Sequence, residues 1–172
     1  MIRNIFIIQN GIALVKLHFG NCHSLTGDST LIAGFMSGLD SFSQEITGSS
    51  IKSMTVEDYH FYFYKNGDPL ELLYVFICDS DDDSEQIDFK LKKTAELFQD
   101  KYAGKVDDFD GEISKFKAFK ETLLDMNIAQ KNCGGRPECE GCPNSTNVLK
   151  FLGSFQKEKK GFFSRLKSFF KR

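Results

Sequence analysis

The sequence lacks a long hydrophobic run. Although 41% of its 172 residues are hydrophobic, no apolar stretch approaches the roughly 18 residues that a membrane-spanning helix needs. The apolar start, MIRNIFIIQNG, reaches a turn signal at Asn10-Gly11 and has no small-residue cleavage site, so it does not resemble a signal peptide. We therefore expect one domain with a tail, made and kept in the cytosol.

The signatures of common enzyme sites are also missing. The chain contains no G-x-S-x-G, no P-loop G-x-x-x-x-G-K-[ST], no G-x-G-x-x-G and no H-E-x-x-H. It has three histidines, without an evident catalytic partner pattern, and His60 lies between aromatic residues in a strand-like run. We therefore predict that the protein is not an enzyme.

The number of cysteines is odd, and most of them are crowded together. Three of the five cysteines form the pattern Cys133-x5-Cys139-x2-Cys142, which suits reduced thiols or a metal better than a secreted disulfide framework. Zinc wants four ligands. The fourth would come from a second chain or from one of His18, Cys22 and His23. Unliganded thiols, a zinc site and a redox or intermolecular disulfide stay open, and no other cofactor is expected.

An acidic run at 79–85, DSDDDSE, begins like a calcium-binding EF-hand loop. Asp79, Asp81 and Asp83 have the spacing of its first half. The match then fails, because Ser84 replaces the required glycine and Lys90 replaces the glutamate that completes the calcium shell. We expect a solvated loop that caps the next helix, whose N-terminus favours negative charge.

Hydrophobic patterns predict an α/β fold of the α+β kind. Asn10-Gly11 between two strand-like runs is a strong hairpin signal. The expected strands are 4–9, 12–18, 51–55, 59–65 and 71–79. The first expected helix has about 17 residues and runs from the caps Asp28 or Ser29 up to Gly48; two more are expected at 84–102 and 112–128. Because the strand at 71–79 is apolar on both alternating faces, helices should cover both sides of the sheet.

Gly34 and Gly38 lie one turn apart on one side of the first helix. The membrane meaning of G-x-x-x-G requires an apolar 20-mer, which this helix is not. We therefore expect the two glycines to let the helix pack closely on the sheet.

The order hairpin, helix, three-stranded meander, helix, helix resembles the longin domain. The stretch LIAGFMSGLDSFSQEITGSSIKSMTVEDYHFYFYK, residues 31–65, is similar to the corresponding region of Mon1/Ccz1-like and archaeal longin-type proteins. The resemblance covers residues 1–128. It implies a three-layer α/β/α module with a five-stranded, mainly antiparallel sheet, one helix on one face and two on the other. It also implies a scaffold that binds a small Ras-like GTPase or another longin or roadblock chain.

The remaining residues do not continue as a longin SNARE would. Residues 129–147 form a cysteine-containing linker with glycines and prolines, and no sustained heptads follow. A SNARE role is therefore not expected.

The C-terminal segment, 148–172, has the pattern of an amphipathic helix. At about 100° per residue, five apolar residues fall within an arc of about 120°: Phe162, Phe163, Leu166, Phe169 and Phe170. The cations Arg165, Lys167, Lys171 and Arg172 lie opposite. Residues 145–172 carry eight Lys/Arg and one Asp/Glu, a net charge of +7, against −9 for residues 1–144.

Such a helix is typical of reversible attachment to an anionic membrane surface. Packing on the acidic body, or self-association, is the competing explanation. Nucleic acid is not expected, because the acidic body would not extend a binding groove.

These patterns together favour a non-catalytic longin-type adaptor or regulator of membrane trafficking or small-GTPase signalling. It would be cytoplasmic and peripherally attached to membrane by its C-terminal helix. The alternatives are a soluble interaction module whose tail packs on its own body or a partner, and a roadblock-like dimerisation scaffold. A homodimer and a heterodimer are both compatible with this expectation.

Overall fold

The computed structural model describes residues 1–20, 27–67 and 70–131. The chain divides into two compact units, Met1–Lys131 and Asn132–Arg172. The second unit lies outside the described residues, and the architecture below is that of the first.

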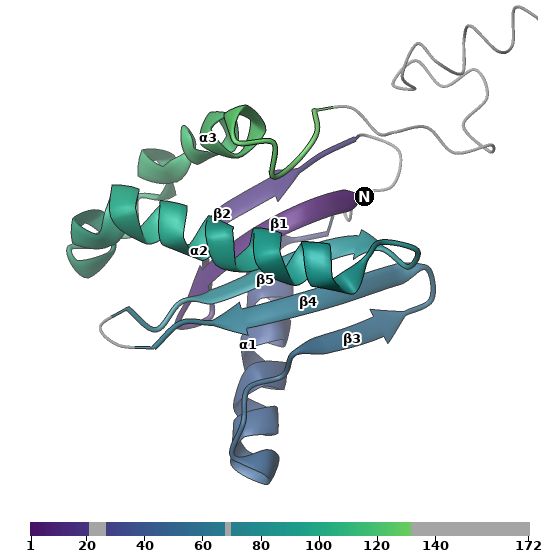
Figure 1. Cartoon of the computed structure of the whole chain (residues 1–172). Coiled ribbons are helices and arrows are strands. Elements are labelled where there is room, and N and C mark those ends of the chain that lie inside the picture. The colour runs from purple at the N-terminus through teal and green to yellow at the C-terminus, as the bar shows by residue number, and fades with distance from the viewer. Residues whose placement is uncertain (21–26, 68–69, 132–172) are drawn as a thin grey trace, which may run out of the picture. The chain divides into compact units, whose positions relative to one another are not determined.

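Five strands form one open sheet in the order β2-β1-β5-β4-β3, and every neighbouring pair is antiparallel (Figure 1). The strands are β1 (Ile2–Gln9), β2 (Ile12–His18), β3 (Ser53–Val56), β4 (Tyr59–Lys65) and β5 (Leu73–Asp79). The β1–β2 hairpin turns at Asn10 and Gly11, which both have positive φ, as a two-residue hairpin turn requires. The predicted hairpin is therefore confirmed.

Three α-helices and one 3-10 turn complete this α+β fold: α1 (Ser29–Thr47), α2 (Ser84–Asp107), η1 (Ile113–Phe116) and α3 (Phe119–Asp125). The central strand β5 is buried over its whole length. Its alternating side chains join two separate apolar clusters, one with residues of α1 and the other with residues of α2 and α3. Within the described ranges, no helix combines the length and apolar character needed to cross a membrane.

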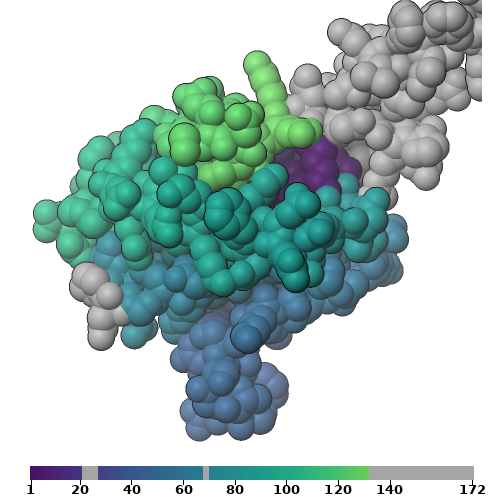
Figure 2. Space-filling model, in the orientation of Figure 1, coloured from purple at the N-terminus to yellow at the C-terminus, as the bar shows by residue number. Residues whose placement is uncertain are grey.

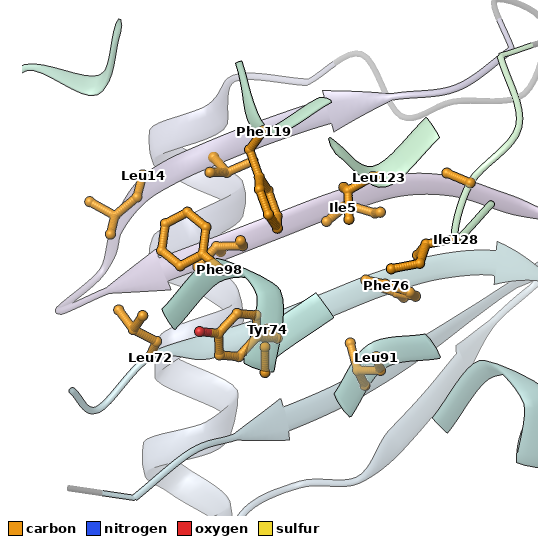
Figure 3. Close-up of a cluster of buried hydrophobic side chains, with 14 of the residues drawn as sticks. Ile5, Leu14, Leu72, Tyr74, Phe76, Leu91, Phe98, Phe119, Leu123 and Ile128 are labelled. Atoms are coloured by element: carbon orange, nitrogen blue, oxygen red, sulfur yellow. The ribbon is translucent and has the colours of Figure 1, made fainter. Parts of the chain in front are cut away.

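The larger cluster lies between the sheet and the helices α2 and α3 (Figure 3). Phe98 of α2 stands at its centre, and its ring centroid lies 5.1 Å from that of Phe119 and 5.6 Å from that of Phe116. Tyr74 of β5 meets the same ring edge-on at 6.3 Å. Edge-to-face and tilted aromatic pairs add to the free energy gained from burial alone, so this face of the sheet holds most of the core.

The smaller cluster lies on the opposite face. Strand residues make up most of it: Phe6, Ile8, Phe61, Phe63, Leu73, Val75 and Ile77. Helix α1 contributes only two fully buried apolar side chains, Ala33 and Met36. Figures 1 and 2 show that the end of α1 leading into β3 projects from the rest of this unit.

Two predicted boundaries shift at the second half of the sheet. The strand predicted at 51–55 begins only at Ser53. The strand predicted at 71–79 begins at Leu73, because the preceding loop has its own hydrogen bonds. The Leu72 N–H donates to Asn66 Oδ1 at 2.8 Å, and the Asn66 N–H donates to the Leu72 carbonyl at 3.3 Å.

The helical boundaries differ more. The helix predicted at 84–102 continues to Asp107, because buried Val106 extends the apolar stripe one turn beyond Tyr102. The prediction of a single helix at 112–128 was wrong. This segment contains the 3-10 turn η1 followed by the short helix α3. Asn127, with φ 53°, ends α3 in a Schellman motif in which the Ile128 N–H donates to the Leu123 carbonyl at 3.0 Å.

Candidate protein-interaction surface

Helix α1 is fixed at both ends by its own sequence. Asp28 caps the N-terminus, since its Oδ1 accepts hydrogen bonds from the N–H groups of Thr30 (2.8 Å) and Leu31 (3.0 Å). The bonds from Leu31 and Thr30 lower the pKa of Asp28. Gly48, with φ 70°, ends the helix, and its N–H donates to the Gln44 carbonyl at 2.9 Å. The predicted start and end of this helix are confirmed.

The side of α1 that faces the sheet is narrow and buries few residues. Its buried residues are Ala33, Met36 and Asp40. Ile32, which is half-buried, packs against the same cluster. Most of the large apolar side chains of this helix therefore lie elsewhere.

Four large apolar side chains point away from the sheet, and we call them the α1 stripe. Their exposed fractions are 74% for Leu31, 53% for Phe35, 65% for Phe42 and 66% for Ile46. At about 100° per residue their directions span an arc of about 60°, opposite to the arc of the buried residues. The stripe is a continuous apolar face with no covering element among the described residues.

Helix α1 carries little charge, and none of it is positive. Its only ionisable side chains are Asp40 and Glu45. Helices that lie in membrane interfaces place lysine and arginine beside their apolar face. The α1 stripe lacks these cations, which distinguishes it from the predicted tail helix.

The expected role of Gly34 and Gly38 was wrong. Both residues are exposed, and a Cβ atom built at either position would meet no other atom within 4 Å. The glycines do not approach the sheet; they open one flank of a groove, which we call the α1 pocket. The pocket has a volume of about 280 Å³ and is lined by Ile8, Asn10, Gly11, Gly34, Ser37, Gly38, Asp40, Ser41, Lys65, Glu71 and Leu73.

Charged groups meet at this pocket. Asp40 is only 3% exposed, and its Oδ2 accepts a hydrogen bond from Gln44 Nε2 at 2.8 Å. The ammonium nitrogen of Lys65 lies 3.4 Å from the same oxygen and 3.8 Å from Glu71 Oε2. The second oxygen of Asp40, Oδ1, is buried and has no hydrogen-bond partner. Two carboxylates and one ammonium thus leave the pocket with a net negative charge.

No family model matches this sequence, and a search of curated proteins finds no match.

The sites predicted in the C-terminal part lie outside the described residues. These are the membrane-binding residues Phe162, Phe163, Arg165, Leu166, Lys167, Phe169, Phe170, Lys171 and Arg172, and the cysteines 133, 139 and 142. Cys78 is described and is buried in β5, where burial raises the pKa of its thiol. Within the described ranges, no three metal-ligating side chains come together.

The acidic loop before α2 has two structural roles. Asp83 caps α2, as predicted, because its Oδ1 accepts from the N–H groups of Glu85 (2.9 Å) and Gln86 (3.0 Å). Asp79 instead pairs with Arg3, whose Nη2 lies 2.6 Å from Asp79 Oδ2. Burial opposes ionisation of Asp79, but the hydrogen bond from Arg3 and the nearby N-terminal ammonium together lower its pKa.

Sequence reasoning found the apolar residues of α1 but not the direction in which they point.

His60 is a face residue of the sheet, as predicted, and stacks on Tyr62 with ring centroids 4.6 Å apart. The pair of Asp40 and Lys65 was missed. One signal was available: Asp40 follows Met36 by one helical turn, which places a carboxylate on the inward side of an otherwise apolar helix.

Proposed function

We propose that the protein is a non-catalytic adaptor or regulator of the longin type, acting in membrane trafficking or small-GTPase signalling. In this proposal residues 1–128 form a three-layer α/β/α module, with α1 on one face of the sheet and α2 and α3 on the other. The module presents the α1 stripe to a protein partner, while the basic C-terminal helix, 148–172, holds the chain reversibly on an anionic membrane.

The observation that carries the proposal is the α1 stripe. Four bulky side chains, each more than half exposed, lie side by side on a helix whose opposite side is already packed. Soluble proteins rarely expose contiguous apolar area of a few hundred Å² unless it marks an interaction site. The stripe is therefore the described surface best suited to a partner.

Charge argues that this partner is a protein. An anionic bilayer would gain nothing from α1, whose ionisable side chains are both acidic, because juxtamembrane attraction comes from lysine and arginine. A protein surface can instead cover the stripe with its own apolar residues. The order of elements, which resembles the longin domain, points to a small Ras-like GTPase or another longin or roadblock chain.

Binding to purified partners tests the stripe. The full chain and its Phe42→Ser variant would be compared with a panel of Ras-like GTPases, nucleotide-free and GTP-loaded, and with the chain itself by light scattering. Loss of a central apolar contact should weaken binding about 30-fold or more. Phe89→Ser is the matched control, because Phe89 is a similarly exposed phenylalanine on α2. Recovery of no GTPase and no dimer would exclude the tested Ras-like GTPases and a second copy of this chain as partners.

Membrane attachment has a separate test. Co-sedimentation of the full chain with anionic liposomes should be lost on deletion of residues 148–172 and weakened by salt, since the attraction of cations to anionic lipids is screened. Absence of binding by the intact chain would exclude the membrane role and favour a soluble interaction module.

A further inference from the structure

The α1 pocket borders the α1 stripe. Gly34 and Gly38 form its flank on the helix, and on a helical wheel they lie next to Leu31, at the margin of the stripe. Because a Cβ built at either glycine would meet nothing within 4 Å apart from its chain neighbours and the nearby backbone of α1, a side chain from a docked partner could lie against the helix here.

Asp40, which lines the pocket, has one carboxylate oxygen without a hydrogen-bond partner. This oxygen, Oδ1, is buried, and a buried polar atom left unsatisfied destabilises the protein. The nearby ammonium of Lys65 interacts with the other oxygen, Oδ2, at 3.4 Å. Glu71, which is exposed, adds a second carboxylate on the rim. A positively charged donor entering the pocket would therefore meet two carboxylates and one competing cation.

We infer that the α1 pocket receives an arginine side chain of the partner that docks on the α1 stripe; this inference rests on the proposed function. A guanidinium carries five N–H donors in a planar fork, so one group can bind Asp40 and reach Glu71 at the same time. A lysine ammonium is a compact point charge and duplicates what Lys65 already supplies.

The size of the pocket agrees with one side chain. Its volume of about 280 Å³ lies just below the range of roughly 300–1,000 Å³ that is typical of small-molecule sites. The open glycine flank and the apolar residues Ile8 and Leu73 in the lining suit the methylene stem of arginine, which is apolar, while its charged end meets the carboxylates.

A small probe tests the pocket without the partner. The full-length, 15N-labelled chain would be titrated by NMR with N-acetyl-arginine amide and, separately, with the uncharged N-acetyl-citrulline amide at matched ionic strength. Saturable shifts are expected at the amides of Gly34, Gly38 and Ser41. Citrulline should bind at least about tenfold more weakly, because its uncharged urea group lacks the positive charge that attracts the two carboxylates.

Two variants remove the site in different ways. Asp40→Asn keeps the shape of the side chain and removes the charge, so arginine binding should fall at least about tenfold. Gly38→Leu fills the flank and should abolish binding while the helix stays folded, because leucine is a better helix former than glycine. Gly104→Leu on α2 is the matched control, since its Cβ position is equally open, and it should leave the titration unchanged.

The inference is overturned if arginine causes no saturable shift at these amides, if citrulline binds equally well, or if Gly38→Leu binds as the wild type does. This failure is distinguishable from failure of the proposed function. Phe42→Ser should weaken partner binding about 30-fold or more yet leave the arginine titration intact, because Phe42 does not line the pocket. If Phe42→Ser weakens partner binding but the wild-type chain shows no saturable arginine titration, the role of the α1 stripe is retained and the role of the α1 pocket is rejected.

Discussion

Helices α1 and α2 pack on opposite faces of one sheet and use their apolar residues in opposite ways. Helix α2 directs its apolar residues inward: Ile87, Leu91, Ala95, Phe98, Tyr102 and Val106 are all buried. Helix α1 buries Ala33 and Met36 and leaves four larger apolar side chains exposed. The packing of α1 on the sheet therefore uses only part of the apolar pattern of this helix.

The two faces of the sheet also differ in how much of the apolar core and how much charge they hold. The α2 face holds an aromatic cluster with ring centroids 5.0 to 6.3 Å apart. The α1 face holds a smaller cluster together with charged groups, among them the buried carboxylate of Asp40. The α2 face therefore holds most of the buried apolar core, and the α1 face is the one to which we assign binding in the proposed function.

The largest effect on stability should come from the α2 face. Phe98→Ala removes the central ring of the cluster and should lower the free energy of unfolding by about 3–5 kcal/mol, because it leaves a cavity among buried side chains. Urea denaturation of the full chain measures this effect. A loss below about 1 kcal/mol would contradict the assignment of the main core to this face, given the usual effect of point mutations.

An acid-dependent effect should come from Asp79. Its pKa is lowered in the folded state, so its stabilising contribution is present above the unfolded value of about 3.9 and is lost as the pH falls through the lower folded value. Asp79→Asn should therefore lower stability at pH 7 by about 1.5–3 kcal/mol, the usual worth of hydrogen bonds to a charged group. Its stability should also depend less on pH below 4 than that of the wild type.

The control for this prediction is Asp88→Asn. Asp88 and Lys92 form an ion pair in which both side chains are 53% exposed, and such pairs contribute little to stability. Urea denaturation at several pH values should show only a small change for this variant. If Asp79→Asn and Asp88→Asn changed the free energy of unfolding equally, the acid sensitivity would come from the overall charge of the protein and not from the ion pair between Arg3 and Asp79.

A smaller effect, of opposite sign, is expected at the open flank of α1. Gly38→Ala should raise the free energy of unfolding by about 0.5–1 kcal/mol, because alanine is the better helix former and its Cβ would meet no other atom within 4 Å. Gly104→Ala on α2 should give a similar gain for the same reason. Destabilisation by Gly38→Ala alone, measured by urea or thermal denaturation, would show that the glycine packs closely after all.

The smallest effect on stability should come from the stripe itself. Phe42→Ser replaces a side chain that is 65% exposed, so the free energy of unfolding should change by no more than about 0.5 kcal/mol. Thermal denaturation of the dilute full chain checks this. A loss comparable to that of Phe98→Ala would mean that the stripe is already covered in the free protein.

Much of the fold follows from local patterns in the sequence. The Asn10-Gly11 turn and the Asp28 and Gly48 caps of α1 are all observed, since each depends on the conformational preferences of a few neighbouring residues. The break between η1 and α3 was not predicted. Asn127 does signal the end of α3, because asparagine tolerates the left-handed conformation of a Schellman motif.

The candidate site was less predictable because it depends on tertiary packing. The apolar residues of α1 cover a broad arc of the helix, and periodicity alone does not say which margin of that arc meets the sheet. The contact between Asp40 and Lys65 joins residues that are distant in the sequence and meet only when α1 packs on the sheet. Gly34 and Gly38 were predicted to pack against the sheet because periodicity does not say which side of the helix faces it.

The most direct test of the central claim is hydroxyl-radical footprinting of Phe42, compared with Phe98 and Phe89, in the full chain alone and in complex with its GTPase or second-chain partner. We predict that Phe42 reacts as readily as Phe89 in the free chain and becomes protected in the complex, while Phe89 stays reactive. Protection of Phe42 equal to that of Phe98 in the dilute free chain, or undiminished reactivity of Phe42 in the complex, would contradict the account.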